Sequence, residues 1–231
     1  MNASPHIAML VPANNTTMAL ELPRWMPPGG RYTTLRIPRS TGLLTSETLP
    51  AYCGHAVDLG ASLAGTDVDL IAYGCTAAGF ILGPEGDADI AQRLAQASGK
   101  PVVTTASSMI SVLEQISARR IALLTPYQDD VNIRLRAFLA HYGIETAAFD
   151  SFYAADVNEL GSITAEQVRE RALKLASGVE VDALFIACSQ LPTADVTEAL
   201  QQALGIPVLS SIGATAQQAS KRLEAQARPA H

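Results

Sequence analysis

The sequence predicts an α/β protein of two pseudo-symmetric lobes, each a mostly parallel sheet with helices on both faces, separated by a cleft. Short apolar runs of strand length alternate with helical patterns, which is typical of parallel sheets. Two of these runs, residues 68–76 and 181–189, both open on Val-Asp and carry Cys75 and Cys188 near their ends. The strands of the first half also reappear in the same order in the second half.

An internal duplication explains this repeated order. Residues 121–126 match residues 7–12 at an offset of 114 positions, and Cys188 follows Cys75 by 113 positions. A third match joins residues 205–211 to residues 99–105 at an offset of 106 positions. Such nearly constant spacing indicates two copies of one unit. We therefore expect an N-terminal lobe over residues 1–117 and a C-terminal lobe over 118–213, with a final helix (214–231) that returns to the first lobe.

The elements expected in the first half follow from apolar periodicity and from glycine, proline and capping residues. In order, they are a strand at residues 7–11, a helix from about Met18, a loop at 23–30, a strand at 32–37, a helix at 51–63, the Cys75 strand, a glycine-bearing loop with Gly79, Gly83 and Gly86, a helix at 88–97, a strand at 102–105 and a helix at 107–117.

The second half repeats the pattern. Its expected elements are a strand at 121–126, a helix at 130–142, a strand at 144–149, a loop, a helix opened by a capping box of Thr164 and Gln167, the Cys188 strand, a strand at 206–210 and a helix at 214–226.

Composition limits the classes of function. The 231 residues are 48% hydrophobic and 16% charged, which supplies a sizeable core. The apolar runs are too short to span a bilayer, and the N-terminus lacks the pattern of a signal peptide, so we expect a cytoplasmic protein. A net charge of −6 without a basic cluster argues against nucleic acid or an anionic membrane as partner. The apolar composition is compatible with a homo-oligomer.

Neutral polar residues gather where the expected strands end, which is where ligands bind in parallel α/β sheets. The residues that stand at these ends are Asn14, Asn15, Cys75, Thr76, Ala77, Tyr127, Cys188, Ser189 and Gln190. These hydroxyl, amide and backbone groups suit a bound carboxylate, and none of them is basic. A thiol at a helix N-terminus can have a lowered pKa, so we expect Cys75 and Cys188 to be reactive. Cys53, inside a helix pattern, is expected to be a small buried apolar residue.

No cofactor or metal is expected. The first strand is followed by Val-Pro-Ala-Asn-Asn and not by a glycine-rich turn, so the dinucleotide fingerprint is missing. The four histidines are scattered without the spacing of a zinc site. Two thiols facing one carboxylate can act as an acid and a base, or as a nucleophile and a proton donor.

At this point the chain resembles the aspartate/glutamate racemase superfamily, in its branch of maleate cis-trans isomerases and arylmalonate decarboxylases. The motifs that carry the resemblance are Val11-Pro12-Ala13-Asn14-Asn15-Thr16-Thr17-Met18, Tyr73-Gly74-Cys75-Thr76, Thr125-Pro126-Tyr127 and Ala187-Cys188-Ser189-Gln190-Leu191-Pro192. The resemblance implies two α/β lobes that enclose a small carboxylate, without cofactor or metal.

Carried over by position, Cys75 resembles the isomerases' cysteine that attacks the double bond of maleate, and Cys188 the cysteine that supplies or removes a proton. The resemblance assigns carboxylate binding to Asn15 and Tyr127, and places Asn158 near a further carboxylate-binding asparagine. We therefore expect an isomerase of a small mono- or dicarboxylate, acting by maleate-type isomerisation or by racemisation next to a carboxylate.

Two alternatives stay open. The arylmalonate decarboxylases have glycine in place of Cys75 and use the second cysteine as proton donor. Thr76 matches one hydroxyl of their dioxyanion hole, whereas Ala77 stands where another is expected. The other alternative is a non-catalytic module that binds a carboxylate.

Overall fold

The two parallel sheets have the same strand order, as the duplication predicts. The computed structural model describes residues 4–39, 42 and 44–227. Its first sheet has the order β2 (Arg31–Ile37), β1 (His6–Pro12), β3 (Leu70–Tyr73), β4 (Val102–Thr104). The second has the order β6 (Glu145–Ser151), β5 (Arg120–Thr125), β7 (Ala183–Ile186), β8 (Val208–Ser210). All neighbouring strands are parallel, which confirms the predicted fold class.

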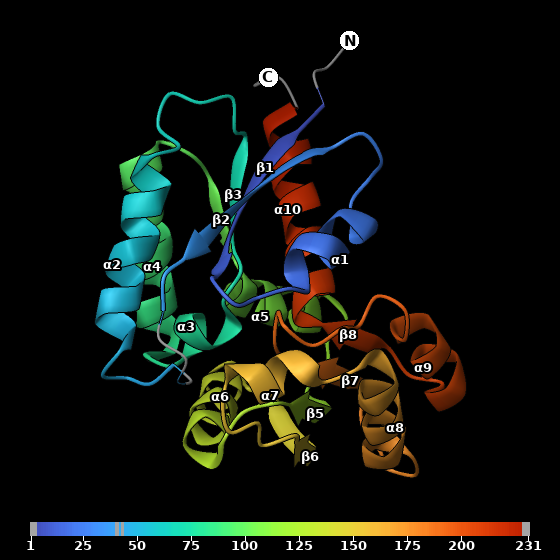
Figure 1. Ribbon diagram of the computed structural model, residues 1–231. Coiled ribbons are helices and arrows are strands. Elements are labelled where there is room, and N and C mark those ends of the chain that lie inside the picture. The colour runs from blue at the N-terminus through green and yellow to red at the C-terminus, as the bar shows by residue number, and fades with distance from the viewer. Residues whose placement is uncertain (1–3, 40–41, 43, 228–231) are drawn as a thin grey trace.

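Helices cover both faces of each sheet (Figure 1). In the first lobe α2 and α4 lie on one side, and α1 and α10 on the other, while α6 and α8 flank the second sheet. The helices are α1 (Met18–Trp25), α2 (Leu49–Ala61), α3 (Thr76–Phe80), α4 (Gly83–Ser98), α5 (Thr105–Gln115), α6 (Asp129–His141), α7 (Val157–Ser162), α8 (Ala165–Ala176), α9 (Thr197–Leu204) and α10 (Ser211–Ala227).

The central strand β1 explains why its sequence is apolar at nearly every position. Side chains alternate between the two faces of a strand. Ile7, Met9 and Val11 belong to the apolar cluster under α1 and α10. Ala8 and Leu10 belong to the larger cluster on the α2 and α4 side. A strand buried on both faces therefore has no polar alternation.

The glycines after Cys75 lie in helices, so the expected loop over residues 79–86 is wrong. Gly79 lies in α3, and α4 already begins at Gly83. A Cβ on Gly79 would stand 2.5 Å from the Ala106 Cβ and 2.6 Å from Asp87 Oδ1. This glycine is needed for close packing of helices, and the sequence alone does not distinguish that use from a turn. The short helices α7 and α9 were also not expected. The capping box of Thr164 and Gln167 is confirmed.

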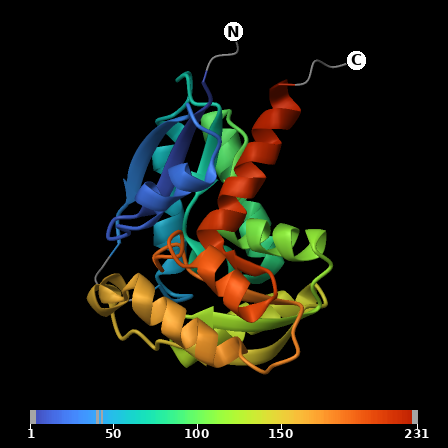
Figure 2. The same ribbon diagram turned by 90° about the vertical axis from the view of Figure 1, so that its right-hand side faces the viewer.

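The lobes are joined by hydrogen bonds between residues far apart in sequence. The Asn15 side chain donates to Ser189, and the Thr17 hydroxyl donates to the Gln190 carbonyl oxygen at 2.8 Å. The last helix, α10, contacts α1 and α5 of the first lobe, as predicted, and runs along that lobe in Figure 2. The residue limits proposed for the two lobes remain a prediction. Among the described residues, no helix has the length and apolar character needed to cross a membrane.

Candidate active site

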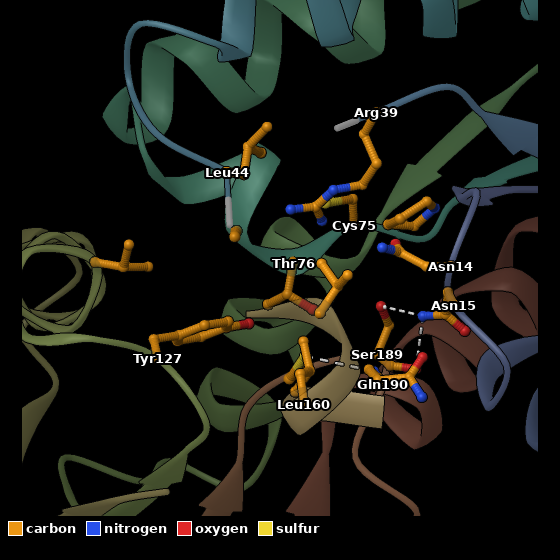
Figure 3. Close-up of a pocket in the computed structure, with 15 residues that line it drawn as sticks. Asn14, Asn15, Arg39, Leu44, Cys75, Thr76, Tyr127, Leu160, Ser189 and Gln190 are labelled. Carbon is orange, nitrogen blue, oxygen red and sulfur yellow. Dashed lines mark hydrogen bonds between the residues drawn. The ribbon is translucent and has the colours of Figure 1, made fainter. Parts of the chain in front are cut away.

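A cavity lies between the two lobes at the carboxyl ends of the strands (Figure 3). It holds about 560 Å³ of space free of atoms, part of which opens to solvent. Both lobes contribute side chains. The lining residues are Pro12, Asn14, Asn15, Arg39, Leu44, Cys75, Thr76, Ala77, Tyr127, Val131, Val157, Leu160, Cys188, Ser189 and Gln190. The structure thus brings both predicted cysteines to one cavity.

Cys75 directly precedes α3, which places it at the end of β3. Gly74 before it permits the close approach of α1, since a Cβ there would stand 2.3 Å from Met18 Sδ. Burial raises the pKa of the Cys75 thiol. This rise in the pKa is opposed by the nearby Arg39 charge, by the backbone N–H groups of Ala77 and Ala78, and by the Tyr52 hydroxyl. The pKa of Cys75 is therefore raised in spite of its place before a helix, because the loss of hydration outweighs the donors around the sulfur.

Cys188 follows β7 with a backbone φ of +154°, a region that non-glycine residues seldom adopt. Its N–H donates to the Ser211 hydroxyl at 3.0 Å, and its sulfur accepts from the Gln190 N–H at 3.4 Å. Burial raises the pKa of this thiol to about 11. At neutral pH Cys188 is therefore a protonated thiol, suited to donating a proton.

Two hydroxyl groups of the cavity lack hydrogen-bond partners among the described residues. They are Thr76 Oγ1 and Tyr127 Oη, which are both buried, and the Tyr127 hydroxyl lies near Thr76 and the Cys188 thiol. The Tyr127 ring packs edge-on against Phe80 at 5.7 Å between ring centres. Burial of unpaired polar atoms is costly unless a ligand or water satisfies them. These hydroxyls are therefore available to bind a carboxylate.

A network behind Tyr127 fixes its position, and sequence analysis missed it. The Tyr127 carbonyl oxygen accepts from Asn132 Nδ2 at 2.7 Å and from the Ser151 hydroxyl at 2.6 Å. The Thr125 hydroxyl donates to Asn132 Oδ1 at 2.6 Å. These residues come from β5, β6 and α6, so their meeting depends on the tertiary fold.

Asn15 is already occupied by structural hydrogen bonds. Its Oδ1 accepts from the N–H groups of Thr17 and Met18, which caps α1. Its Nδ2 donates to the carbonyl and hydroxyl oxygens of Ser189, each at 3.1 Å. The Ser189 hydroxyl in turn donates to the Gly74 carbonyl oxygen at 2.7 Å. Asn15 and Ser189 thus connect the lobes beside the cavity, while Asn14 also lines it (Figure 3).

Arg39, which follows β2, also lines the cavity and was not predicted as a site residue. Its side chain extends toward Cys75 (Figure 3). The expectation of a site without a basic residue is therefore wrong. No site residue was predicted at the end of β2, because the sequence Pro38-Arg39 has no feature that distinguishes it from an ordinary loop.

Asn158 does not line the cavity. Its side chain is exposed on α7, and the apolar Val157 and Leu160 of the same helix line the cavity instead. A helix turns by about 100° per residue, so neighbouring positions face different directions. Cys53 is buried in α2 outside the cavity, as expected.

Within residues 4–39, 42 and 44–227, no group of three or more His, Cys, Asp or Glu side chains is arranged to hold a metal ion.

The sequence matches a known family over almost its whole length. Residues 9–231 match the family model of arylmalonate decarboxylase. The chain belongs to the arylmalonate decarboxylase family. The expected branch is thereby confirmed.

The chain also shares sequence with individual proteins, and these proteins have two different activities. A maleate isomerase of Nocardia farcinica is 29% identical over 91% of this chain and 86% of its own length. An arylmalonate decarboxylase of Bordetella bronchiseptica is 27% identical over 90% and 82%. Among solved structures, a mutant maleate cis-trans isomerase of N. farcinica with a covalently bound succinylcysteine intermediate has a TM-score of 0.84 and 26% identity, covering 95% of this chain and 93% of that one.

Proposed function

We propose that this chain is a cofactor-independent isomerase of a small carboxylic acid and that Cys75 and Cys188 act on the substrate from the two lobes. The observation that carries the proposal is that both thiols line the same cavity. The relatives that are maleate isomerases support an isomerase. The succinylcysteine in the N. farcinica enzyme supports covalent catalysis by a cysteine.

The substrate carboxylate binds to donors that have no other partner. The hydroxyls of Thr76 and Tyr127 are such donors, and the N–H groups at the start of α3 add to them. In the reactive form the two thiols share one proton. We assign it to Cys188, because the Arg39 charge favours the thiolate of Cys75 and burial raises the pKa of Cys188 to about 11. Asn158 has no part in this arrangement, and Asn15 positions Ser189.

Cis-trans isomerisation then needs two balanced steps. The Cys75 thiolate forms a C–S bond to one alkene carbon, and the π electrons move toward the adjacent carboxylate. Cys188 gives its proton to the carbon that gained the electrons. After rotation about the new single bond, the Cys188 thiolate removes a proton and the C–S bond breaks. Racemisation uses the same thiols differently: one removes the proton next to the carboxylate and the other returns one on the opposite face.

Proton NMR in D2O with a set of small mono- and dicarboxylates tests the proposal. Isomerisation, proton exchange next to the carboxylate and decarboxylation give separate signals in one spectrum. We expect isomerisation or exchange with the wild type and a loss of about 100-fold or more in Cys75→Ser. Cys53→Ala removes a thiol outside the cavity and is the matched control. Full turnover by Cys75→Ser on every substrate would refute the two-thiol mechanism.

Decarboxylation of a malonate-type substrate is the second candidate. Part of the cavity lining is apolar, contributed by Leu44, Val131, Val157 and Leu160, and it suits an apolar substituent. In this reaction Cys188 is the proton donor. CO2 release that survives Cys75→Ser but not Cys188→Ser would favour this candidate over the isomerase. A binding module is favoured if carboxylates raise the melting temperature of the protein but none is converted.

Association into a homo-oligomer and a cytoplasmic location stay predictions.

A further inference from the structure

Arg39 is the only charged side chain among the described residues that line the cavity. The other polar lining residues carry amide, hydroxyl or thiol groups. The protein as a whole has a net charge of −6, so this cation is not part of a generally basic surface. Arg39 therefore gives the cavity its positive charge.

The Arg39 guanidinium has no counter-ion within the part of the chain that the structure describes. It forms no ion pair with any described carboxylate. Its Nη2 donates to the Gly42 carbonyl oxygen at 2.6 Å, whereas its buried Nε has no partner among the described residues. A guanidinium has five N–H donors, and the Arg39 side chain is only partly buried, so a ligand can reach the donors that are free. The donors that remain free fit a carboxylate, which binds in a bidentate manner.

Arg39 and the two unpaired hydroxyls line the same cavity as Cys75. In Figure 3 the Arg39 guanidinium lies beside Cys75, and Thr76 lies between Cys75 and Tyr127. The cavity therefore has one group of neutral donors at Thr76 and Tyr127 and a cationic group at Arg39. A substrate with two acidic groups would offer an anion to both groups of donors.

We propose that Arg39 is a specificity-determining residue that binds a second carboxylate of the substrate. A monocarboxylate held at Thr76 and Tyr127 would leave the guanidinium without an anion. A site with an unpaired polar group discriminates strongly against a ligand that lacks the matching group. This inference deepens the proposed isomerase, on which it rests for the location of the site.

Binding of saturated ligands tests Arg39 without any need for turnover. The probes are succinate and its monoamide, succinamate, which have nearly the same size and differ by one negative charge. Isothermal titration calorimetry gives both dissociation constants for the wild type, Arg39→Gln and Arg39→Lys. Arg31→Gln is the matched control, because it removes an arginine from the opposite end of β2 that pairs on the surface with Asp67.

We expect the wild type to bind succinate about tenfold or more tightly than succinamate, the difference that a charge-assisted bidentate pair gives. Arg39→Gln should abolish this preference, and Arg39→Lys should keep part of it, because lysine retains the charge without the planar fork. Arg31→Gln should behave as the wild type. Thermal melting of each variant, which checks that it is folded, accompanies the titrations.

Equal affinities for the two ligands in the wild type would overturn the inference, as would a preference that persists in Arg39→Gln. The absence of measurable succinate binding to the wild type would overturn it as well. An Arg39-dependent preference without turnover of any carboxylate would uphold the inference and refute the isomerase. The two hypotheses therefore fail in different measurements.

Discussion

The interior of the first lobe contains charged groups, whereas the buried polar groups described in the second lobe are all neutral. Glu21 and Asp87 are buried carboxylates of the first lobe, and Arg39 adds a cation at the cavity. In the second lobe, hydroxyls and amides such as those of Thr125, Asn132 and Ser151 take the buried polar positions. One duplicated fold therefore places its two thiols in different electrostatic surroundings.

The difference separates the roles of the two thiols. The positive charge of Arg39 favours the anionic form of Cys75, as a nucleophile requires. Among the described residues, no cation is a main cause of the Cys188 pKa. Burial raises this pKa, and the Tyr127 hydroxyl and the backbone N–H groups only partly oppose the rise. Strand order thus fixes where the thiols are, while the residues around them fix their protonation. Four predictions test this difference between the lobes.

The largest effect is expected at Glu21, the first-lobe carboxylate that binds the second lobe. Its oxygens accept from the Thr193 N–H at 2.9 Å and the Ala194 N–H at 3.1 Å, and from the Thr193 hydroxyl. Glu21→Ala leaves these donors unpaired and should lower the free energy of unfolding by about 2–4 kcal/mol. Urea denaturation measures the change. Glu114→Ala, at an exposed position on α5, is the control, and an equal effect there would contradict a specific connection between the lobes.

Asp87 should make the stability of the first lobe depend on pH. Burial raises the pKa of this carboxyl to about 6, above its ordinary 3.8. A raised carboxyl pKa favours the folded state at low pH, and this contribution is lost as the pH rises from about 4 through 6. Asp87→Asn cannot ionise, so its stability relative to the wild type should increase by about 1–3 kcal/mol between pH 4 and pH 7.5.

Denaturation of both proteins across this pH range measures that difference. Asp89→Asn is the matched control, since Asp89 lies on the same helix but its carboxylate is exposed beside Arg93. A pH-independent difference for Asp87→Asn would show that the carboxyl ionises normally.

The two cavity thiols should differ in their rate of alkylation. A thiol with a pKa of about 11 is ionised in about one molecule in a thousand at pH 8. Cys75 next to Arg39 should therefore react with iodoacetamide about tenfold or more faster than Cys188. Peptide mass spectrometry over time measures both rates, and Cys53 serves as the internal control outside the cavity. Faster labelling of Cys188 would reverse the proposed roles.

The smallest effects are expected for the two tyrosines that lie near the thiols. Tyr127→Phe removes a hydroxyl from the cavity and should lower kcat/KM about tenfold. The Tyr52 hydroxyl acts on Cys75 but does not line the cavity. Tyr52→Phe should leave KM unchanged, and should move the pH profile of Cys75 alkylation toward higher pH. Steady-state kinetics and the alkylation profile separate the two roles, and a raised KM in Tyr52→Phe would contradict this assignment.

Local patterns were sufficient to predict both sheets and both thiols. Apolar runs that end on Cys75 and Cys188, repeated at nearly constant spacing, identify the central strands. The same reasoning failed where one residue type has two uses. Gly79 permits close helix packing and does not mark a turn. For Asn158 the family resemblance suggested carboxylate binding, but the rotation of α7 turns Val157 and Leu160 to the cavity and leaves Asn158 in solvent.

By itself, the sequence determined the duplicated α/β fold and the presence of both cysteines at matching strand ends, because these features depend on local periodicity and spacing. Only the tertiary structure decided that Asn15 connects the lobes, that Arg39 reaches the cavity and that the pKa of each thiol is raised. Those outcomes depend on hydration and on charges brought together from distant positions. Hydration and charge interactions both depend on which residues lie close together in space, and the order of residues in the sequence does not give those distances.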